Sequence, residues 1–99
     1  MPEEREPTLT KQTMVVLSIL IGSRDAIAGS TLSIESELAS GSLYPILLRL
    51  EKAGWIKSEW EGGEEGAKPR RRLYSITGLG TRRARQEAKE LRQLTERFA

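Results

Sequence analysis

The sequence predicts one small domain of the α+β class that is mainly helical, and three observations predict it. Over the first half of the 99 residues, apolar side chains recur at helical spacing. After Gly54 the spacing changes to two, which is typical of half-exposed strands, and a second such stretch follows a glycine-rich turn. From Thr77 helical spacing returns and continues almost to the last residue. We therefore expect three helices, a two-stranded hairpin and one long terminal helix.

The N-terminal part is expected to contain a tail and a well-covered helix. Residues 1–8 show no apolar periodicity and are predicted to be disordered. Thr8 or Thr10 can cap a first helix that continues to about Ile21. Apolar residues surround this helix almost completely, so both its own domain and a second subunit are expected to cover it. The side assigned to the second subunit carries Met14, Leu17 and Ile21.

A second helix is predicted from Ala26 to about Glu35, with Asp25 as its cap. Ile27 and Leu32 are expected to point inward, and Ile34 is a third candidate for the core. A tight turn then leads to another helix. Two helices of this length joined by a short turn are a helix-turn-helix candidate.

The third helix lies in the stretch Gly41 to Trp55 and is expected to be buried on one side only. Ser40 or Ser42 can cap its start, Pro45 must lie near that start, and Gly54 ends it in a left-handed conformation. The inward positions are Leu43, Ile46, Leu47, Leu50 and Ala53. The outward positions are Gly41, Tyr44, Pro45, Leu48, Arg49 and Lys52. Such a helix suits insertion into a DNA groove, and an ordinary amphipathic helix with a solvated face is the alternative.

Basic residues are concentrated on the second strand of the predicted hairpin. Strands are expected from Ile56 to about Trp60 and from Arg70 to Ile76, the latter with Tyr74 turned toward the core. The segment from Lys68 to Arg85 holds seven cations and no acid. The cations of the hairpin are Lys68, Arg70, Arg71 and Arg72. Either these cations are only solvated on an exposed hairpin, or they contact DNA phosphates and release counterions from the DNA.

The terminal helix is expected to begin after Thr77 and to carry one apolar stripe. A narrow stripe on a long helix has little left to cover within so small a domain, so the same stripe or the first helix of another copy is its expected partner. Acidic residues mixed into the polar face disfavour a membrane-surface helix. The stripe assigned to dimerisation is Ala84, Ala88, Leu91, Leu94 and Phe98.

Composition excludes several classes of function. Without Cys or His, the chain has no thiolate chemistry and lacks the commonest general base and metal ligand, so we expect no enzyme, metal or cofactor. The acidic N-terminus is not a signal peptide, and the longest apolar run is too short to cross a bilayer. We expect a cytoplasmic protein without membrane contact.

Two stretches resemble the PadR family of bacterial transcriptional regulators. Gly41 to Ile56, GSLYPILLRLEKAGWI, is similar to the family's first signature, and Lys68 to Gly80, KPRRRLYSITGLG, is similar to its second. The resemblance covers about residues 9 to 90. It implies a winged helix-turn-helix domain at residues 9–76 with a two-stranded wing, a C-terminal dimerisation helix at residues 77–99, and repression of transcription.

The chain departs from the family pattern in two respects. Many members have a Gly-Tyr pair in the second helix, where this sequence has Ala26-Ile27 or Ala28-Gly29. The long extra helices of the larger subgroup are absent from the sequence given. The resemblance therefore leaves open whether a small-molecule effector binds at the dimer interface.

The predicted partners are double-stranded DNA and a second copy of the chain. Two third helices would enter successive major grooves about 34 Å apart over an inverted-repeat operator. The alternative is a winged-helix protein-interaction module without DNA binding, which the acidic turn Glu61, Glu64 and Glu65 supports. The predicted DNA-binding residues are Ser40, Ser42, Tyr44, Pro45, Leu48, Arg49, Lys52, Lys68, Arg70, Arg71 and Arg72.

Overall fold

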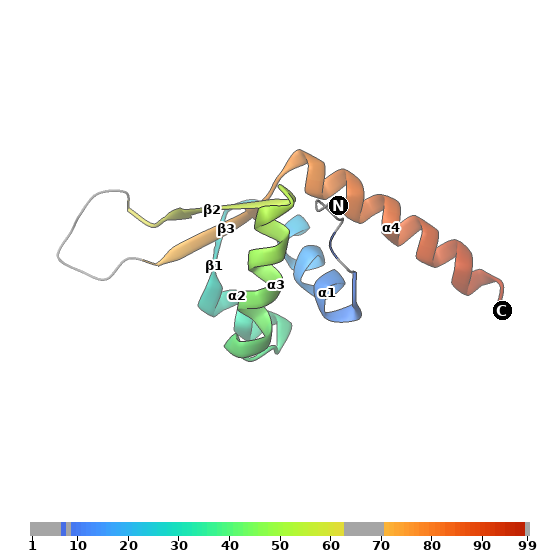
Figure 1. Cartoon of the computed structure of the whole chain (residues 1–99), viewed down its shortest axis with the longest axis horizontal. Coiled ribbons are helices and arrows are strands. Elements are labelled where there is room, and N and C mark those ends of the chain that lie inside the picture. Colours follow the sequence, from blue (N-terminus) through green and yellow to red (C-terminus); the bar gives the residue numbers. More distant parts are fainter. Residues whose placement is uncertain (1–6, 8, 63–70, 99) are drawn as a thin grey trace, which may run out of the picture.

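The computed structural model describes residues 7, 9–62 and 71–98, and it is mainly helical, as predicted. The elements in chain order are α1 (Lys11–Ile21), β1 (Ile27–Ala28), α2 (Gly29–Ser36), α3 (Ser40–Lys52), β2 (Ile56–Trp60), β3 (Arg72–Ile76) and α4 (Gly78–Glu96). The hairpin of β2 and β3 extends from one end of the molecule, and α4 extends from the other (Figure 1). The arrangement is a winged helix-turn-helix, which confirms the predicted fold class.

Two threonine caps confirm the predicted starts of the first and last helices. Thr10 is the N-cap of α1, and its hydroxyl accepts a hydrogen bond of 3.1 Å from the backbone N–H of Thr13. Thr77 is the N-cap of α4, and its hydroxyl accepts a hydrogen bond of 3.0 Å from the Gly80 N–H. These side chains satisfy donors that the first turn of a helix leaves unpaired.

The predicted start of the second helix is wrong. Ile27 and Ala28 form the short strand β1, which pairs antiparallel with Tyr74 and Leu73 of β3. The sheet therefore has three strands in the order β1-β3-β2. Helix α2 begins only at Gly29, and its N-cap is Ala28, not Asp25.

The inward assignment of Ile34 is also wrong. Its side chain is 77% exposed, whereas Leu32 is fully buried in the core. Leu32 and Ile34 are two positions apart, which corresponds to about 200° around a helix axis. Their side chains therefore point to nearly opposite sides of α2. Gly29 is the other buried residue of this helix.

The third helix starts without a serine cap. Its N-cap is Ala39, whose side chain makes no capping hydrogen bond, and Ser40 is already helical. Pro45 lies in the second turn, not the first, so the carbonyl of Gly41 lacks its usual i+4 donor. The predicted end is confirmed, because Gly54 follows the helix with φ at +81°.

The core lies between α1, α2, α3 and the sheet. Leu43, Ile46, Leu47 and Leu50 of α3 are buried, which confirms the predicted inward face. Each such side chain stabilises the fold by roughly 1.5–3 kcal/mol. The remaining buried members are Val16, Leu17, Leu20, Leu32, Trp55, Ile56, Tyr74 and Ala84.

The ends of four elements meet at Thr77. Its hydroxyl lies 2.7 Å from the carbonyl oxygen of Gly54 and 2.9 Å from that of Trp55, and its backbone N–H donates to the Trp55 oxygen at 2.9 Å. Gly80 packs directly over the same backbone, since a Cβ on Gly80 would overlap the Trp55 carbonyl group. This junction joins the end of α3 and the start of β2 to the end of β3 and the start of α4.

We therefore expect Gly80→Ala to lower the free energy of unfolding by about 1–3 kcal/mol, because the obstacle is backbone that cannot rotate away. Gly41→Ala is the matched control, since a Cβ there has no heavy atom within 4 Å. Alanine is the better helix former, so the control should keep or raise stability by roughly 0.5–1 kcal/mol. Urea denaturation at one protein concentration measures both, and an unchanged midpoint for Gly80→Ala would contradict the close packing of α4 on Trp55.

Candidate nucleic-acid interface

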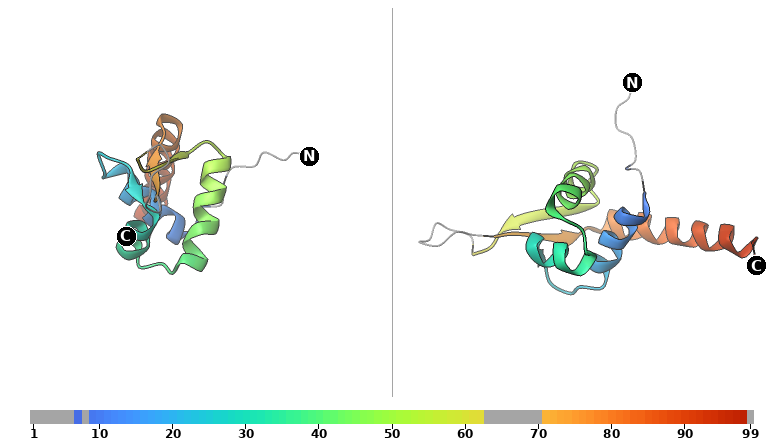
Figure 2. Two further views of the ribbon diagram at one scale, coloured as in Figure 1. Left: turned by 90° about the vertical axis from the view of Figure 1, so that its left-hand side faces the viewer. Right: turned by 90° about the horizontal axis from the view of Figure 1, so that it is seen from below.

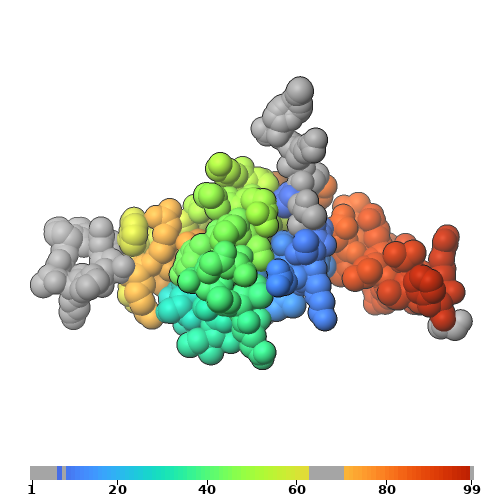
Figure 3. All heavy atoms as spheres, turned by 60° about the horizontal axis from the view of Figure 1, so that its bottom comes forward, coloured from blue at the N-terminus to red at the C-terminus, as the bar shows by residue number. Residues whose placement is uncertain are grey.

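One side of α3 is left open by the rest of the described chain. In both views of Figure 2, α3 stands on one side of the molecule, and its outward side occupies the middle of the face shown in Figure 3. The residues exposed there are Ser40, Gly41, Ser42, Tyr44, Pro45, Leu48, Arg49 and Lys52. All the α3 residues predicted to bind DNA are thus brought together on one accessible surface, which we name the outer face of α3.

Tyr44 lies along the edge of this face and does not stand straight out from it. Its side chain is 42% exposed, and its hydroxyl lies where a Cβ on Gly29 would be. Burial raises the pKa of Tyr74, and the nearby Tyr44 phenol adds to that rise. Tyr44 therefore packs against the first residue of α2, and only part of its ring faces outward.

Arg49 and Lys52 are the two cations of the last turn of α3. Both are exposed, and neither forms an ion pair with another residue of the described chain. Cations at a helix C-terminus also interact favourably with the helix dipole. Within the described part of the chain, the outer face therefore presents two positive charges that no acidic side chain pairs with.

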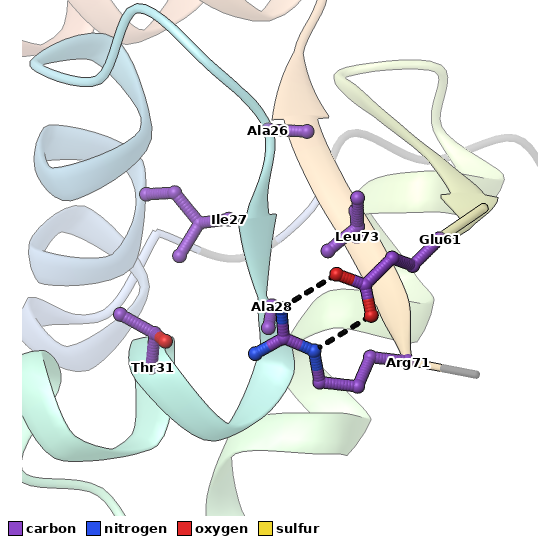
Figure 4. Close-up of a pocket in the computed structure, with 7 residues that line it drawn as sticks. All are labelled: Ala26, Ile27, Ala28, Thr31, Glu61, Arg71 and Leu73. Carbon is purple, nitrogen blue, oxygen red and sulfur yellow. Dashed lines mark hydrogen bonds and ion pairs between the residues drawn. The ribbon is translucent and has the colours of Figure 1, made fainter. Parts of the chain in front are cut away.

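Arg71 has a partner within the hairpin. Its Nε and Nη2 donate to the two carboxylate oxygens of Glu61 at 2.9 and 2.7 Å, as Figure 4 shows. The hydrogen bond from Arg71 lowers the pKa of Glu61, and the carboxylate in turn raises the pKa of Arg71. The charge predicted to meet a phosphate is therefore largely balanced by Glu61.

Arg72 is held against α3 by a small polar network. Its Nε donates to the Ser58 hydroxyl at 3.0 Å, and that hydroxyl donates to Glu51 Oε2 at 2.7 Å. An Arg72 guanidinium nitrogen lies 3.8 Å from the same Glu51 oxygen, and the guanidinium lies 5.1 Å from the centre of the Trp60 ring. These contacts connect both strands of the hairpin to the end of α3.

Sequence reasoning did not assign Glu51 and Ser58 to the site. The pairing of Glu61 with Arg71 could have been expected from the register of the hairpin. Trp60 pairs with Arg72, so the next residue of each segment brings Glu61 beside Arg71. Opposite charges directly across two strands are expected to pair. Glu51 could not be found in this way, since it lies on another element.

Several predicted residues lie outside the described part of the chain. These are Lys68 and Arg70 of the basic cluster, the acidic residues Glu64 and Glu65, and the predicted N-terminal tail except Pro7.

The apolar stripe of α4 is exposed over its C-terminal half, where Figure 1 shows the helix extending away from the rest of the chain. Ala88, Leu91, Leu94 and Phe98 are all accessible, and Phe98 is 82% exposed. Met14 and Ile21 of α1 are half-buried.

Leu17 and Ala84 are not available to a second copy, so their assignment to the dimer surface is corrected. Leu17 is 1% exposed and Ala84 is 3% exposed. Both belong to the core, and a side chain already covered by its own chain has no surface left for a partner.

Two open grooves flank β1 and α2. The groove in Figure 4 has a volume of about 320 Å³ and includes Ile27, Thr31 and the Glu61–Arg71 pair in its lining. The second has a volume of about 370 Å³ and lies between the end of α1 and α2. Both grooves are open to solvent. Among residues 7, 9–62 and 71–98, no group of three acidic, His or Cys side chains could hold a metal ion.

No helix in the described part of the chain combines the length and apolar character needed to span a bilayer. The structure is that of a winged-helix protein whose α3 presents two cations with no ion-pair partner in the described part of the chain. The sequence model of the transcriptional regulator PadR-like family matches residues 28–86, more than half of the chain, so the chain belongs to this family.

Solved structures agree with this assignment. A PadR-like transcription factor from Bacteroides fragilis is 25% identical, with 90% of each chain covered and a TM-score of 0.68. A PadR family regulator from Clostridium difficile R20291 has the same fold at 23% identity, with 88% of this chain and 93% of that chain covered and a TM-score of 0.73.

The fold is also shared more widely. The PcaV transcriptional regulator from Streptomyces coelicolor, solved with its natural ligand, is 20% identical with a TM-score of 0.73. That match covers 94% of this chain and 62% of PcaV. No curated protein matches the chain by sequence.

The Arg71–Glu61 ion pair of the hairpin leads to a testable prediction. Arg71→Ala should raise the pKa of Glu61 toward its ordinary value of 4.5, because the lowering comes first from the hydrogen bond with Arg71. With its folded-state pKa lowered, Glu61 adds stability above its unfolded-state pKa, and this is lost as the pH falls through the folded-state pKa. Carboxyl NMR titration measures the shift.

Arg72→Ala is the matched control for this titration. It removes an arginine from the next position of the chain, and Arg72 donates to Ser58 instead. The control should leave the Glu61 pKa low. Equal shifts in the two variants would contradict a specific Arg71–Glu61 pair.

Proposed function

We propose that the chain is a cytoplasmic, homodimeric repressor of transcription that binds an inverted-repeat operator in duplex DNA, with α3 in the major groove. The observation that carries the proposal is the outer face of α3, which no other described element covers. This face bears Arg49 and Lys52, neither of which has an ion-pair partner among the described residues. Repression would follow from excluding RNA polymerase from the promoter.

The dimensions of α3 support this placement. Its 13 residues give a length of about 20 Å, and an α-helix fits the major groove, which is about 12 Å wide. Arg49 and Lys52 would contact phosphates or base edges, and Ser40 and Ser42 are exposed at the start of the helix where backbone contacts commonly occur. Tyr44 and Pro45 would complete the contact surface.

Gly41 gives further support. Glycine is unfavourable in a helix, and open space surrounds the position that its Cβ would occupy, so the fold itself has no need for a glycine there. A DNA strand lying close to this end of α3 would explain the missing side chain.

The hairpin would contribute less charge than its arginines suggest. Arg71 is balanced by Glu61, and Arg72 is shared among Ser58, Glu51 and Trp60. We therefore assign Arg72 mainly to holding the wing against α3. Lys68 and Arg70 are proposed as the phosphate contacts of the wing.

The second copy would bind through α4. Ala88, Leu91, Leu94 and Phe98 recur at intervals of three or four residues and are exposed, as expected of a stripe that pairs with another copy. Met14 and Ile21 would widen this contact. The pairing would set the distance between the two α3 helices at one turn of DNA, about 34 Å.

The alternative function is a protein-interaction module that binds no DNA. Glu61 supports it, because a carboxylate at the wing repels phosphate and removes the net charge of Arg71. A mobility-shift assay with the promoter region of the protein's own gene separates the two functions. A footprint repeated with candidate ligands would show whether a small molecule binds between the subunits and releases DNA.

Phosphate contact by Arg49 can be measured from the dependence of binding on salt. Arg49→Ala should weaken binding and reduce the slope of log K against log salt by about 1 for each subunit that loses a phosphate contact. Arg24→Ala is the control, because the loop between α1 and β1 lies on the other side of the molecule from α3 (Figure 2). A wild-type slope near zero would rule out the proposed mode of binding.

Dimerisation by α4 is tested with Leu94→Glu. Placing a charge in the stripe should raise the dimer dissociation constant at least tenfold, or about 1.4 kcal/mol, as measured by sedimentation velocity. Gln93→Glu places the same charge one residue away, outside the stripe, and should leave the dimer intact. A monomeric wild-type chain, or equal effects of the two variants, would contradict the proposal.

A further inference from the structure

One side chain of the outer face of α3 cannot take part in the polar contacts proposed above. Leu48 is 54% exposed, whereas Leu43, Leu47 and Leu50 of the same helix are at most 1% exposed. The fold therefore uses the other leucines for its core and leaves Leu48 outside.

The surroundings of Leu48 are mainly polar and cationic, apart from Pro45, which lies three residues before it and is also exposed. Tyr44 and Lys52 lie four residues before and after it, in the same row along the helix, and Arg49 is the next residue. All of these neighbours are exposed. Single exposed leucines are common on protein surfaces, so exposure alone assigns no role. What distinguishes Leu48 is its place near the middle of a face proposed to lie against DNA.

The chemistry of the major groove limits what Leu48 can contact. A leucine side chain neither donates nor accepts hydrogen bonds, so a phosphate or a base acceptor placed against it would lose water without gaining a partner. Among the groups that base pairs present in the major groove, the 5-methyl group of thymine is the apolar one. Contact between this methyl group and Leu48 would remove apolar surface from water on both sides.

We infer that Leu48 determines part of the sequence specificity by packing against the 5-methyl group of a thymine in each operator half-site. The inference rests on the proposed function and names the base feature that its recognition helix reads. Arg49 and Lys52 would supply affinity for the duplex, and Leu48 would favour thymine at one position.

The test removes only the methyl group from the DNA. Duplexes that bind the wild-type chain are first selected from a random library, and each thymine of the selected site is then replaced by deoxyuridine, which keeps the same hydrogen-bonding groups. In each half-site, replacing the one thymine that contacts Leu48 should weaken binding. The affinity should fall by about fourfold per contact, which is the change expected when one buried methyl group is lost. With Leu48→Ala, the same replacement should have no effect.

Lys52→Ala is the matched control on the same helix. It should weaken binding to both duplexes equally and keep the preference for thymine over deoxyuridine. Circular dichroism should show that both variants fold, because neither side chain belongs to the core.

The outcomes separate this inference from the proposed function. If the wild-type chain selects no duplex, both fail. If it selects a site but no replacement by deoxyuridine weakens binding, or Leu48→Ala keeps the discrimination, the role of Leu48 alone is refuted.

Discussion

The architecture depends on the junction at Thr77, where the chain returns to the residues that end α3. One hydroxyl lies within hydrogen-bonding distance of the Gly54 and Trp55 carbonyl oxygens and accepts from the Gly80 N–H. Because Gly80 has no side chain, α4 can begin directly over this backbone. The direction of α4 is thereby fixed relative to the end of α3, although 25 residues separate the two helices along the chain. In a dimer formed through α4, the same junction would determine how far apart the two α3 helices lie.

Charge is divided between α3 and the hairpin in a way that total composition conceals. The net charge of the chain is only +2. Arg49 and Lys52 have no ion-pair partner in the described part of the chain, whereas Arg71 and Arg72 contact Glu61 and Glu51. Exposed ion pairs contribute little stability, so these contacts matter more for where the arginines are held than for folding. The described arginines of the wing therefore orient the hairpin, and α3 carries the charges that remain free for a polyanion.

The sequence predicted those features that depend on neighbours along the chain. Thr10 and Thr77 are caps, and Gly54 ends α3, because the physical cause lies within a few residues of each. Strand β1 was missed, since two residues have no periodicity and its existence depends on pairing with Leu73 and Tyr74. A stretch whose structure is decided by a distant partner cannot be recognised from local pattern alone.

The site could be predicted to a similar extent, and the errors in its prediction have a related cause. Periodicity identified the outer face of α3 correctly, because the fold must bury the opposite face whichever element covers it. It could not say which neighbour covers an apolar residue, so Leu17 and Ala84 were assigned to a partner when the chain's own core buries them.

DNA binding and dimerisation are proposed for two separate surfaces that the core connects. The outer face of α3 and the exposed part of α4 share no residue, and they lie on different parts of the molecule (Figures 1 and 2). Leu17 and Ala84 belong to the core between them, and α1 contacts both α2 and α4. A substitution in the core would therefore alter both surfaces through their relative placement, whereas substitutions on either surface should affect one alone. A ligand that changed the angle between the two paired α4 helices would also change the placement of the two α3 helices. The reason is that the junction at Thr77 holds α3 and α4 of each copy in a fixed orientation.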